Sequence, residues 1–284
     1  MFTRIRVYLS FVRFSHSVFA LPFALAGALL AARRSTVTWA AIGWIVVAMV
    51  AARSAAMAFN RLADARLDAL NPRTANRELP RGAMTRREAV VFVTASSAFF
   101  VYAAWRLSPL CFALSPVALA IVFWYSLAKR HTTWTQLFLG LAMAVAPVGG
   151  WMAAGGRGGW EPWLLGLAIG MWVGGFDVLY ACQDVDFDRA HGLRSIPARF
   201  GVSMALWMSR AMHVIAVTCL LALSLVTPLW RFYHLGVAAV AAMLAYEQSL
   251  VSADDLSQVK RAFDLNGYVG IMYLLVLAAS IYVA

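Results

Sequence analysis

Long runs of apolar residues recur along the chain, and they constrain its fold more than any other feature. Each run is close to the roughly 20 residues that an α-helix needs to cross a bilayer. Backbone groups in hydrocarbon must be hydrogen-bonded within their own segment, and barrel strands would be shorter and would alternate. The sequence therefore predicts an all-α membrane protein with about nine transmembrane helices, over residues 15–32, 38–59, 89–105, 108–128, 134–154, 162–182, 204–226, 229–250 and 267–284.

The composition excludes an ordinary soluble domain. Of the 284 residues, 62% are hydrophobic and only 13% are charged, whereas soluble domains are about half apolar and about a quarter charged. In a soluble protein, a net charge of +11 would suggest that the protein binds nucleic acid. Here the basic residues lie between the apolar runs, so we expect a lipid bilayer and no nucleic acid as partner.

The basic residues also predict an orientation. If the N-terminus is cytoplasmic, 17 of the Lys and Arg residues fall in cytoplasmic segments and five in segments on the other side. An excess of Lys and Arg marks the cytoplasmic side, whereas acidic residues hardly influence insertion. Ten of the 13 acidic residues nevertheless fall on the same side. We therefore expect a multi-pass protein with a cytoplasmic N-terminus and a polar active site at the cytoplasmic mouth.

Two carboxylate clusters follow the second and the sixth predicted spans. The first begins at Asn60 and contains Asp64 and Asp68, and the second, which begins at Tyr180, contains the same DxxxD pattern 120 residues later. Residues four apart share a helix face, so helices that continued past the spans would align each cluster. Like charges at this spacing destabilise a helix. A shared cation explains the duplication better than solvated loop charge does.

Oxygen ligands without His or Cys suit Mg²⁺, which often binds one or two carboxylates together with substrate phosphates. We expect the two clusters to hold Mg²⁺ over one diphosphate through Asp64, Asp68, Asp184 and Asp188. Basic side chains would complete such a site, because Arg binds phosphate through two hydrogen bonds and Lys as a point charge. The candidates on the same side are Arg61, Arg66, Arg73, Arg77, Lys129 and Arg130, for most of which topology is an equally good explanation.

Two charged residues, Arg53 and Asp177, lie deeper, within predicted spans. Each precedes a member of the nearer cluster by seven residues, so it shares that face two turns further in. Intramembrane charges face a cavity or pair with one another. We expect Arg53 and Asp177 to line or brace the cavity floor, as substrate-binding groups or as an ion pair. Tyr125 and Tyr180 could flank a reacting cation, which an aromatic face stabilises by about 0.5–2 kcal/mol.

At these residues the chain resembles the UbiA-type superfamily of intramembrane prenyltransferases. That family carries Asn-Asp-x-x-Asp-x-x-x-Asp after its second helix and DxxxD after its sixth. The first pattern is matched here from Asn60 to Asp68 and the second from Asp184 to Asp188, while Arg61 stands where the family has Asp. The stretches similar to the 4-hydroxybenzoate polyprenyltransferase branch are residues 14–22, 71–80, 125–130, 175–184 and 195–201. The menaquinone-pathway branch, which acts on 1,4-dihydroxy-6-naphthoate, shares the second and the fourth of them.

The resemblance implies a single domain over residues 1–284, with helices around a lipid-open central cavity and cytoplasmic cap loops, in the bacterial inner membrane. It implies Mg²⁺-dependent transfer of a polyprenyl group from a polyprenyl diphosphate to an aromatic acid in quinone biosynthesis. The acceptor would be 4-hydroxybenzoate (ubiquinone) or, alternatively, the naphthoate (menaquinone).

Residue roles also follow from the resemblance. The four motif aspartates are the catalytic, metal-binding residues, with Asn60 as a further oxygen ligand or orienting group. Asp184 or Asp186 is the expected proton acceptor. The expected substrate-binding residues are Arg53, Arg73, Arg77, Tyr125, Lys129, Arg130, Asp177, Tyr180 and Gln183.

Three other classes of protein are weaker explanations. A secondary transporter would also place charges within spans, but nine spans form no even inverted repeat and the carboxylates gather at one mouth. A membrane phosphatidyl-group transferase would show the signature Asp-Gly-x-x-Ala-Arg, which is absent here. A purely structural membrane protein would have no need of the duplicated carboxylate motif.

Overall fold

The computed structural model describes residues 2–12 and 14–282, with the backbone alone at residues 2, 3, 5, 6 and 14–19, and these described residues form helices and no strand. The elements in chain order are α1 (Phe2–Phe11), α2 (Phe14–Ala32), α3 (Trp39–Leu70), α4 (Arg86–Leu107), α5 (Pro109–Ala128), α6 (Thr135–Ala153), α7 (Glu161–Ala181), the 3₁₀ turn η1 (Cys182–Asp184), α8 (Val185–Ala190), α9 (Ile196–Phe200), α10 (Val202–Val226), α11 (Arg231–Ser249) and α12 (Val259–Tyr282).

Each predicted apolar run coincides with one long helix. Seven helices of the described chain are long and apolar enough to cross a bilayer, and α2 adds a shorter apolar stretch, Ala20–Ala32. α3 continues past the predicted end at residue 59 as far as Leu70, and α12 begins at Val259, ahead of the predicted start. The prediction of an all-helical membrane protein is confirmed, whereas the count of nine spans stays a prediction.

The contacts between the long helices of the described chain close into a ring. From α2 to α7, and from α10 to α12, each long helix packs against the next one in the chain; α7 packs against α10, and α12 returns to α2. α6 also packs closely against α2, so the ring is filled by this contact rather than left open along its whole length. One cluster-bearing helix, α3, lies on one side of the α2–α6 contact, and the other, α7, lies on the other side.

Glycines allow the central helices to approach one another closely. A Cβ atom at Gly27 of α2 would collide with the carbonyl of Pro147 in α6, and one at Gly140 of α6 would collide with the carbonyl of Gly170 in α7. Small residues are the usual means by which membrane helices bring their backbones together. These contacts hold α7 at the centre of the bundle, where most of its length is buried.

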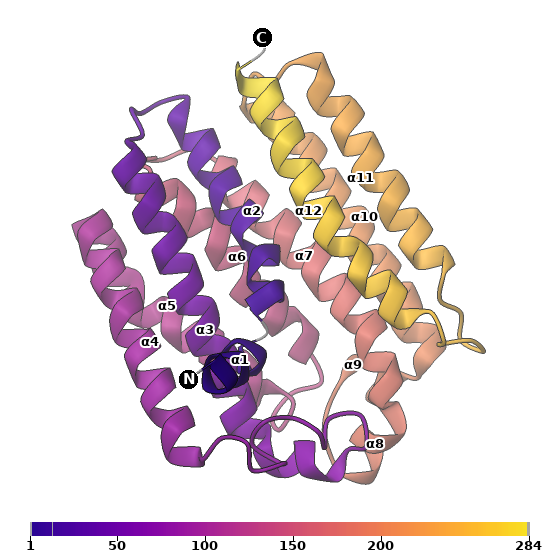
Figure 1. Cartoon of the computed structure of the whole chain (residues 1–284). Coiled ribbons are helices and arrows are strands. Elements are labelled where there is room, and N and C mark those ends of the chain that lie inside the picture. The colour runs from indigo at the N-terminus through magenta and orange to yellow at the C-terminus, as the bar shows by residue number, and fades with distance from the viewer. Residues whose placement is uncertain (1, 13, 283–284) are drawn as a thin grey trace.

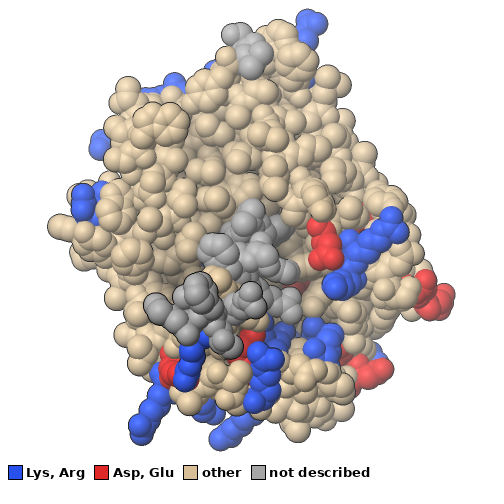
Figure 2. Space-filling model, in the orientation of Figure 1, with Lys and Arg blue, Asp and Glu red and all other residues tan. Residues whose placement is uncertain are grey.

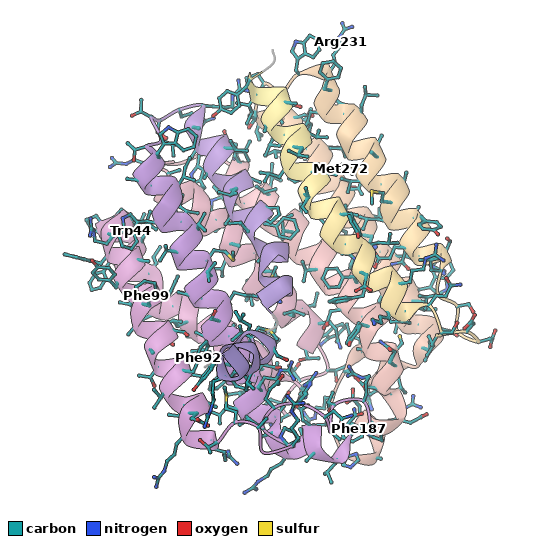
Figure 3. The ribbon with its side chains drawn as sticks, viewed as in Figure 1. Trp44, Phe92, Phe99, Phe187, Arg231 and Met272 are labelled. Atoms are coloured by element: carbon teal, nitrogen blue, oxygen red, sulfur yellow. The ribbon has the colours of Figure 1, made fainter. Side chains whose placement is uncertain are left out.

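Both carboxylate clusters lie at the same end of the bundle, which we call the motif end. Two segments cover it: the first cap loop, residues 71–85 between α3 and α4, and the second cap, residues 182–195, which contains α8 (Figure 1). Figure 3 shows Phe187 of α8 at this end and Arg231 at the opposite one. On the face shown in Figure 2, most charged side chains gather at the motif end, and the surface above it is mainly uncharged, as a bilayer requires.

The first cap loop is anchored where α4 begins. Thr85 is the N-cap of α4: its side chain accepts a hydrogen bond from the backbone N–H of Glu88, whose carboxylate accepts one in return from the backbone N–H of Thr85. Such a reciprocal capping box satisfies two backbone donors at the start of a helix. The loop therefore returns to a fixed point after crossing the motif end.

Candidate active site

A cavity of about 700 Å³ opens at the motif end, with walls from α3, α5, α6, α7 and α12 and from both caps. This volume lies within the range of small-molecule sites. All but two of the expected metal-binding and substrate-binding residues line it: Arg53, Asn60, Asp64, Asp68, Arg73, Arg77, Tyr125, Lys129, Asp177, Tyr180, Asp184 and Asp188. We call it the polar cavity.

The first cluster projects from a continuous helix, as predicted. α3 runs through to Leu70, so Asn60, Asp64 and Asp68 share one face, and Nδ2 of Asn60 lies 3.5 Å from Oδ2 of Asp64. Asp64 is only 3% exposed. Two basic side chains bind it: Lys129 donates to Oδ2 at 2.7 Å, and Arg130 donates to Oδ1 at 2.8 Å. A buried carboxylate is thus bound by two positively charged side chains.

Asp68 is bound by the first cap loop. A single nitrogen of Arg77, Nη1, donates to both carboxylate oxygens, at 2.7 and 2.9 Å. Thr74 donates to the backbone carbonyl of Asp68 at 3.1 Å. The loop therefore folds back onto the helix that precedes it and places its charge next to the cluster.

The second cluster does not lie on a continuous helix, in contrast to the expected arrangement. α7 ends at Ala181, a 3₁₀ turn spans Cys182–Asp184, and α8 follows. The backbone N–H of Cys182 already bonds to Leu179, the i→i+3 pattern that tightens the end of a helix. Because a 3₁₀ turn has about three residues per turn, it rotates the following residues relative to α7. Asp184 and Asp188 nevertheless both line the cavity.

Asp184 is bound by two residues of the first cap loop. Nδ2 of Asn71 donates to it at 3.1 Å, and Arg73 contacts it through both Nε and Nη2. Arg73 also donates to the Tyr180 hydroxyl at 2.8 Å, with its guanidinium 5.2 Å from the ring centre. Burial alone would lower the pKa of Arg73, but the hydrogen bond and the charge of Asp184 raise that pKa above its ordinary value, so Arg73 stays cationic.

Asp188 has a neutral partner. Oγ of Ser195 donates to it at 2.8 Å and also accepts a hydrogen bond from the N–H of Ala198 at the start of α9. The backbone carbonyl of Asp188 accepts from Leu193 at 2.8 Å. The second cap thus closes on itself around Asp188.

Two of the expected substrate-binding residues, Arg130 and Gln183, lie outside the cavity lining. Arg130 binds Asp64 from outside the cavity lining, and it also donates to the backbone carbonyls of Ala63 and Ser126. Gln183 is exposed on the 3₁₀ turn, where its side chain donates to the carbonyl of Tyr180 at 3.2 Å. Arg130 therefore contacts the site by holding the Asp64 carboxylate, whereas Gln183 does not contact the site.

Other cavity residues were not among the predicted site residues. Asn71 and Ser195 each open a stretch that resembles the family, but neutral polar side chains carry no charge pattern that would mark them. Asp264 of α12 also lines the cavity, although it lies far in sequence from both clusters. Arg61, which the sequence already offered as a basic candidate for the diphosphate, lines it as well.

A second, apolar cavity of about 800 Å³ adjoins the first. Its walls come from α2 to α7, and nearly all the lining residues are apolar. The two cavities share Arg53, Tyr125, Leu139 and Met143. The hydroxyl of Tyr125 lies within electrostatic reach of Arg53 and Asp177. These residues therefore stand where a polar chamber meets an apolar one.

The donor set fits a hard divalent cation shared with a ligand. Within the described residues, no three acidic, histidine or cysteine side chains come close enough to hold a metal ion by themselves. The chain instead offers two pairs of carboxylates, from α3 and from the second cap, on the wall of one cavity. Mg²⁺ commonly takes one or two carboxylates and completes its octahedron with water and phosphate oxygens. Such a site needs a phosphorylated ligand to be complete.

The family model for the UbiA prenyltransferase family matches residues 20–277. The 4-hydroxybenzoate octaprenyltransferase of Vibrio vulnificus is 30% identical over 257 residues, which cover 90% of this chain and 89% of that protein. The enzyme of the same name from Vibrio parahaemolyticus is 32% identical over 253 residues, 86% of either chain.

Solved structures agree with the sequence comparisons. A UbiA homolog from Aeropyrum pernix K1 superposes with a TM-score of 0.85 at 38% identity, over 95% of this chain and 98% of the other. A UbiA homolog from Archaeoglobus fulgidus, solved with GPP and Mg²⁺, superposes with a TM-score of 0.74 at 20% identity, over 96% and 99% of the two chains. At that lower identity the likeness concerns the fold alone.

Proposed function

The chain belongs to the UbiA prenyltransferase family, and from this premise we propose that it transfers a polyprenyl group from a polyprenyl diphosphate to 4-hydroxybenzoate in a Mg²⁺-dependent reaction. The observation that carries the proposal is the junction of the two cavities. A chamber lined by carboxylates and basic side chains suits a diphosphate, and the apolar chamber that adjoins it suits an isoprenoid tail.

Mg²⁺ would be held by Asp64, Asp68, Asp184 and Asp188, with Asn60 beside the first pair. When bound, it would neutralise the charge that develops on the leaving diphosphate. The Mg²⁺- and GPP-bound relative from Archaeoglobus fulgidus supports this choice of metal and ligand.

Three of the four motif aspartates are bound by basic side chains, so ligand binding requires an exchange of partners. Lys129 binds Asp64, Arg77 binds Asp68 and Arg73 binds Asp184. We propose that these cations turn from the carboxylates to the diphosphate oxygens when the substrate binds. Each carboxylate is then available to the metal, and each cation meets a charge-assisted partner again. Metal and diphosphate should therefore bind more tightly together than either does alone.

The transfer breaks the bond between C1 of the prenyl group and the diphosphate oxygen, and a ring carbon next to the acceptor hydroxyl bonds to C1. The aromatic residues Tyr125, Phe176 and Tyr180 line the cavity and would flank the positive charge on the allylic group. The ring carbon then loses its proton. Of the two carboxylates expected to accept it, Asp184 lines the cavity and Asp186 is exposed on α8, so we propose Asp184.

Arg53 and Asp177 stand at the inner part of the polar cavity. We propose that Arg53, at the junction of the two cavities, holds the acidic group of the acceptor. The excess of Lys and Arg at the motif end further supports a cytoplasmic position for this end.

A transfer assay on the purified protein in detergent tests the proposal. It combines geranyl or longer prenyl diphosphate and Mg²⁺ with 4-hydroxybenzoate or with 1,4-dihydroxy-6-naphthoate. We expect a prenylated product with 4-hydroxybenzoate and none in the presence of EDTA. Product with the naphthoate alone would keep the reaction and overturn the acceptor. No product with either acceptor, despite EDTA-sensitive binding of the diphosphate, would refute aromatic prenyl transfer.

A further inference from the structure

One buried ion pair beside the polar cavity involves none of the four motif aspartates. Arg61 of α3 lines the cavity and is 4% exposed. Its Nη1 lies 3.9 Å from Oε2 of Glu78, a first cap loop residue that is 5% exposed. Glu78 is not part of the cavity lining. The positive charge of Arg61, which lines the cavity, is thus balanced by the carboxylate of Glu78, which does not line it.

This pairing sets Arg61 apart from other cations of the cavity. Lys129, Arg73 and Arg77 bind motif aspartates, which the proposed metal would take over. Glu78 belongs to neither motif, so a metal bound by the motif aspartates would leave its contact with Arg61 intact. Electrostatic stabilisation is most effective when the charges need no reorganisation during the reaction. Arg61 is therefore placed to act as a fixed cation, whereas the other three have to move.

Glu78 is itself held from two sides. Oγ of Ser10, on α1, donates to its Oε1 at 2.5 Å, and its backbone carbonyl accepts from the N–H of Met84 at 3.2 Å. The same α1 packs against α3, α4 and the first cap loop, in an apolar cluster made of Phe11, Val12, Ala58, Met84 and Ala89. The docking of α1 thereby reaches the cavity wall through two consecutive contacts, from Ser10 to Glu78 and from Glu78 to Arg61.

We propose that Glu78 is a positioning residue that holds the Arg61 guanidinium toward the diphosphate, and that α1 supports it through Ser10. The inference rests on the proposed function, because it assigns Arg61 to the leaving group of the transfer reaction. It adds a cation that is held by a carboxylate outside the two motifs, and a role for the helix that precedes the first span.

The test compares variants of the full chain in detergent by the affinity for geranyl S-thiodiphosphate, an unreactive analogue, in calorimetry, and by kcat and KM. Arg61→Gln should weaken binding about tenfold or more, because it removes one charge-assisted contact. Glu78→Gln should weaken it to a similar extent, and Glu78→Asp should recover part of the loss. In the double variant of Arg61→Gln and Glu78→Gln, affinity should fall no further than in Arg61→Gln alone, since residues that act through one another are not additive.

The matched control is Arg4→Gln. Among the described side chains of α1, Arg4 makes the second polar contact with the rest of the chain, an ion pair with Glu88 on the exposed side of the helix. If the support acts through Ser10, then Ser10→Ala should weaken analogue binding severalfold and Arg4→Gln should leave it unchanged. Equal effects of these two variants would mean that α1 matters only as a whole, and would overturn the role of Ser10.

Other outcomes would overturn the role of Glu78. Wild-type affinity in folded Glu78→Gln, with only the unfolding temperature lowered, would make the pair merely structural, and additive losses in the double variant would show that Glu78 acts elsewhere. Should Glu78→Gln not fold, Glu78→Asp and the double variant decide by the same criteria. If the wild-type protein turns over no prenyl diphosphate with Mg²⁺, the proposed function fails; if it does and the variants match it, only this inference fails.

Discussion

The two DxxxD motifs are alike in sequence and different in structure. Asp64 and Asp68 lie on an unbroken helix and are 3% and 6% exposed. Lys129 and Arg130 bind Asp64, and Arg77 binds Asp68. The second motif spans the junction of a 3₁₀ turn and a short helix, where Asp184 binds Arg73 and Asp188 binds the neutral Ser195. With identical spacing, both aspartates of the first motif are thus paired with basic side chains, whereas in the second motif only Asp184 is.

The difference shows what holds the aspartates of each motif in position. The first motif inherits the rigidity of α3. Its cations come from the segment just after α5, which holds Lys129 and Arg130, and from Arg77 of the first cap loop. The second motif lies beyond the end of α7, so it depends on hydrogen bonds from the two caps, including those of Asn71 and Ser195. We therefore expect charge removal to dominate at the first motif and loss of orientation at the second.

The largest effect is expected from Asp64→Asn. The amide keeps the shape but removes the charge, so the metal loses a ligand and Lys129 and Arg130 face a neutral group. Turnover at saturating substrate should fall by about a thousandfold or more, as for other losses of transition-state electrostatics. Initial rates of the detergent-purified variant measure it. Asp186→Asn, on the exposed side of α8, is the control and should stay within about twofold of wild type. Near-normal turnover of Asp64→Asn would remove the metal role of the first motif.

An intermediate effect separates the two arginines of the first cap loop. Arg73 uses Nε, Nη1 and Nη2 for its contacts, whereas Arg77 contacts Asp68 through Nη1 alone. Lys can replace a single donor but not a planar fork. Arg73→Lys should therefore lower kcat/KM about tenfold, and Arg77→Lys only about twofold, since one lost hydrogen bond to a charged group is worth about 1.5–3 kcal/mol. The reverse ranking would show that the fork of Arg73 is not used in the reaction.

A smaller effect is expected from Ser195→Ala. The substitution removes the hydrogen bond that orients Asp188 and the cap of α9, each worth about 1 kcal/mol. The Mg²⁺ concentration for half-maximal activity should rise severalfold, with little change in kcat at saturating Mg²⁺. Ser249→Ala is the control, because among the described residues that hydroxyl bonds only to the carbonyl of Tyr246 in its own helix. An unchanged Mg²⁺ dependence would mean that the second motif is ordered without Ser195.

The smallest effect is expected at Gln183, one residue before Asp184. The resemblance of this stretch to the family predicts a substrate-binding role, but the side chain is exposed and donates to the carbonyl of Tyr180. We expect Gln183→Ala to keep kcat/KM within about twofold of wild type, as surface substitutions usually do. A tenfold loss in the same transfer assay would show that the 3₁₀ turn rearranges when substrate binds.

Much of the site could be predicted because it depends on local spacing. The period of 3.6 residues placed Asn60, Asp64 and Asp68 on one face of α3, and the structure keeps that helix intact to Leu70. The same reasoning was wrong about the form of the second motif. The spacing of Tyr180, Asp184 and Asp188 is the same as in a helix, and nothing in these residues marks the end of α7 at Ala181. Periodicity describes a helix that continues and does not show where packing ends it.

The spacing of residues in the sequence could not predict which basic side chain pairs with which carboxylate. Lys129 lies 65 residues from Asp64, and Arg73 lies 111 residues from Asp184. Which cation meets which carboxylate depends on the closure of the ring and on the path of the first cap loop. The brace formed by Arg130, the contact of Glu78 with Arg61 and the exposure of Gln183 belong to the same class.

The amino-acid sequence by itself determined the helical membrane class, the places of the long helices, the side on which charge gathers and the duplicated carboxylate motif. These properties follow from hydropathy and from side chains within one or two turns of each other. Only the tertiary structure decided how the two motifs differ, which cations bind them and where the polar cavity meets the apolar one. Those properties arise from contacts between segments far apart in the chain, whose geometry depends on the packing of the whole ring.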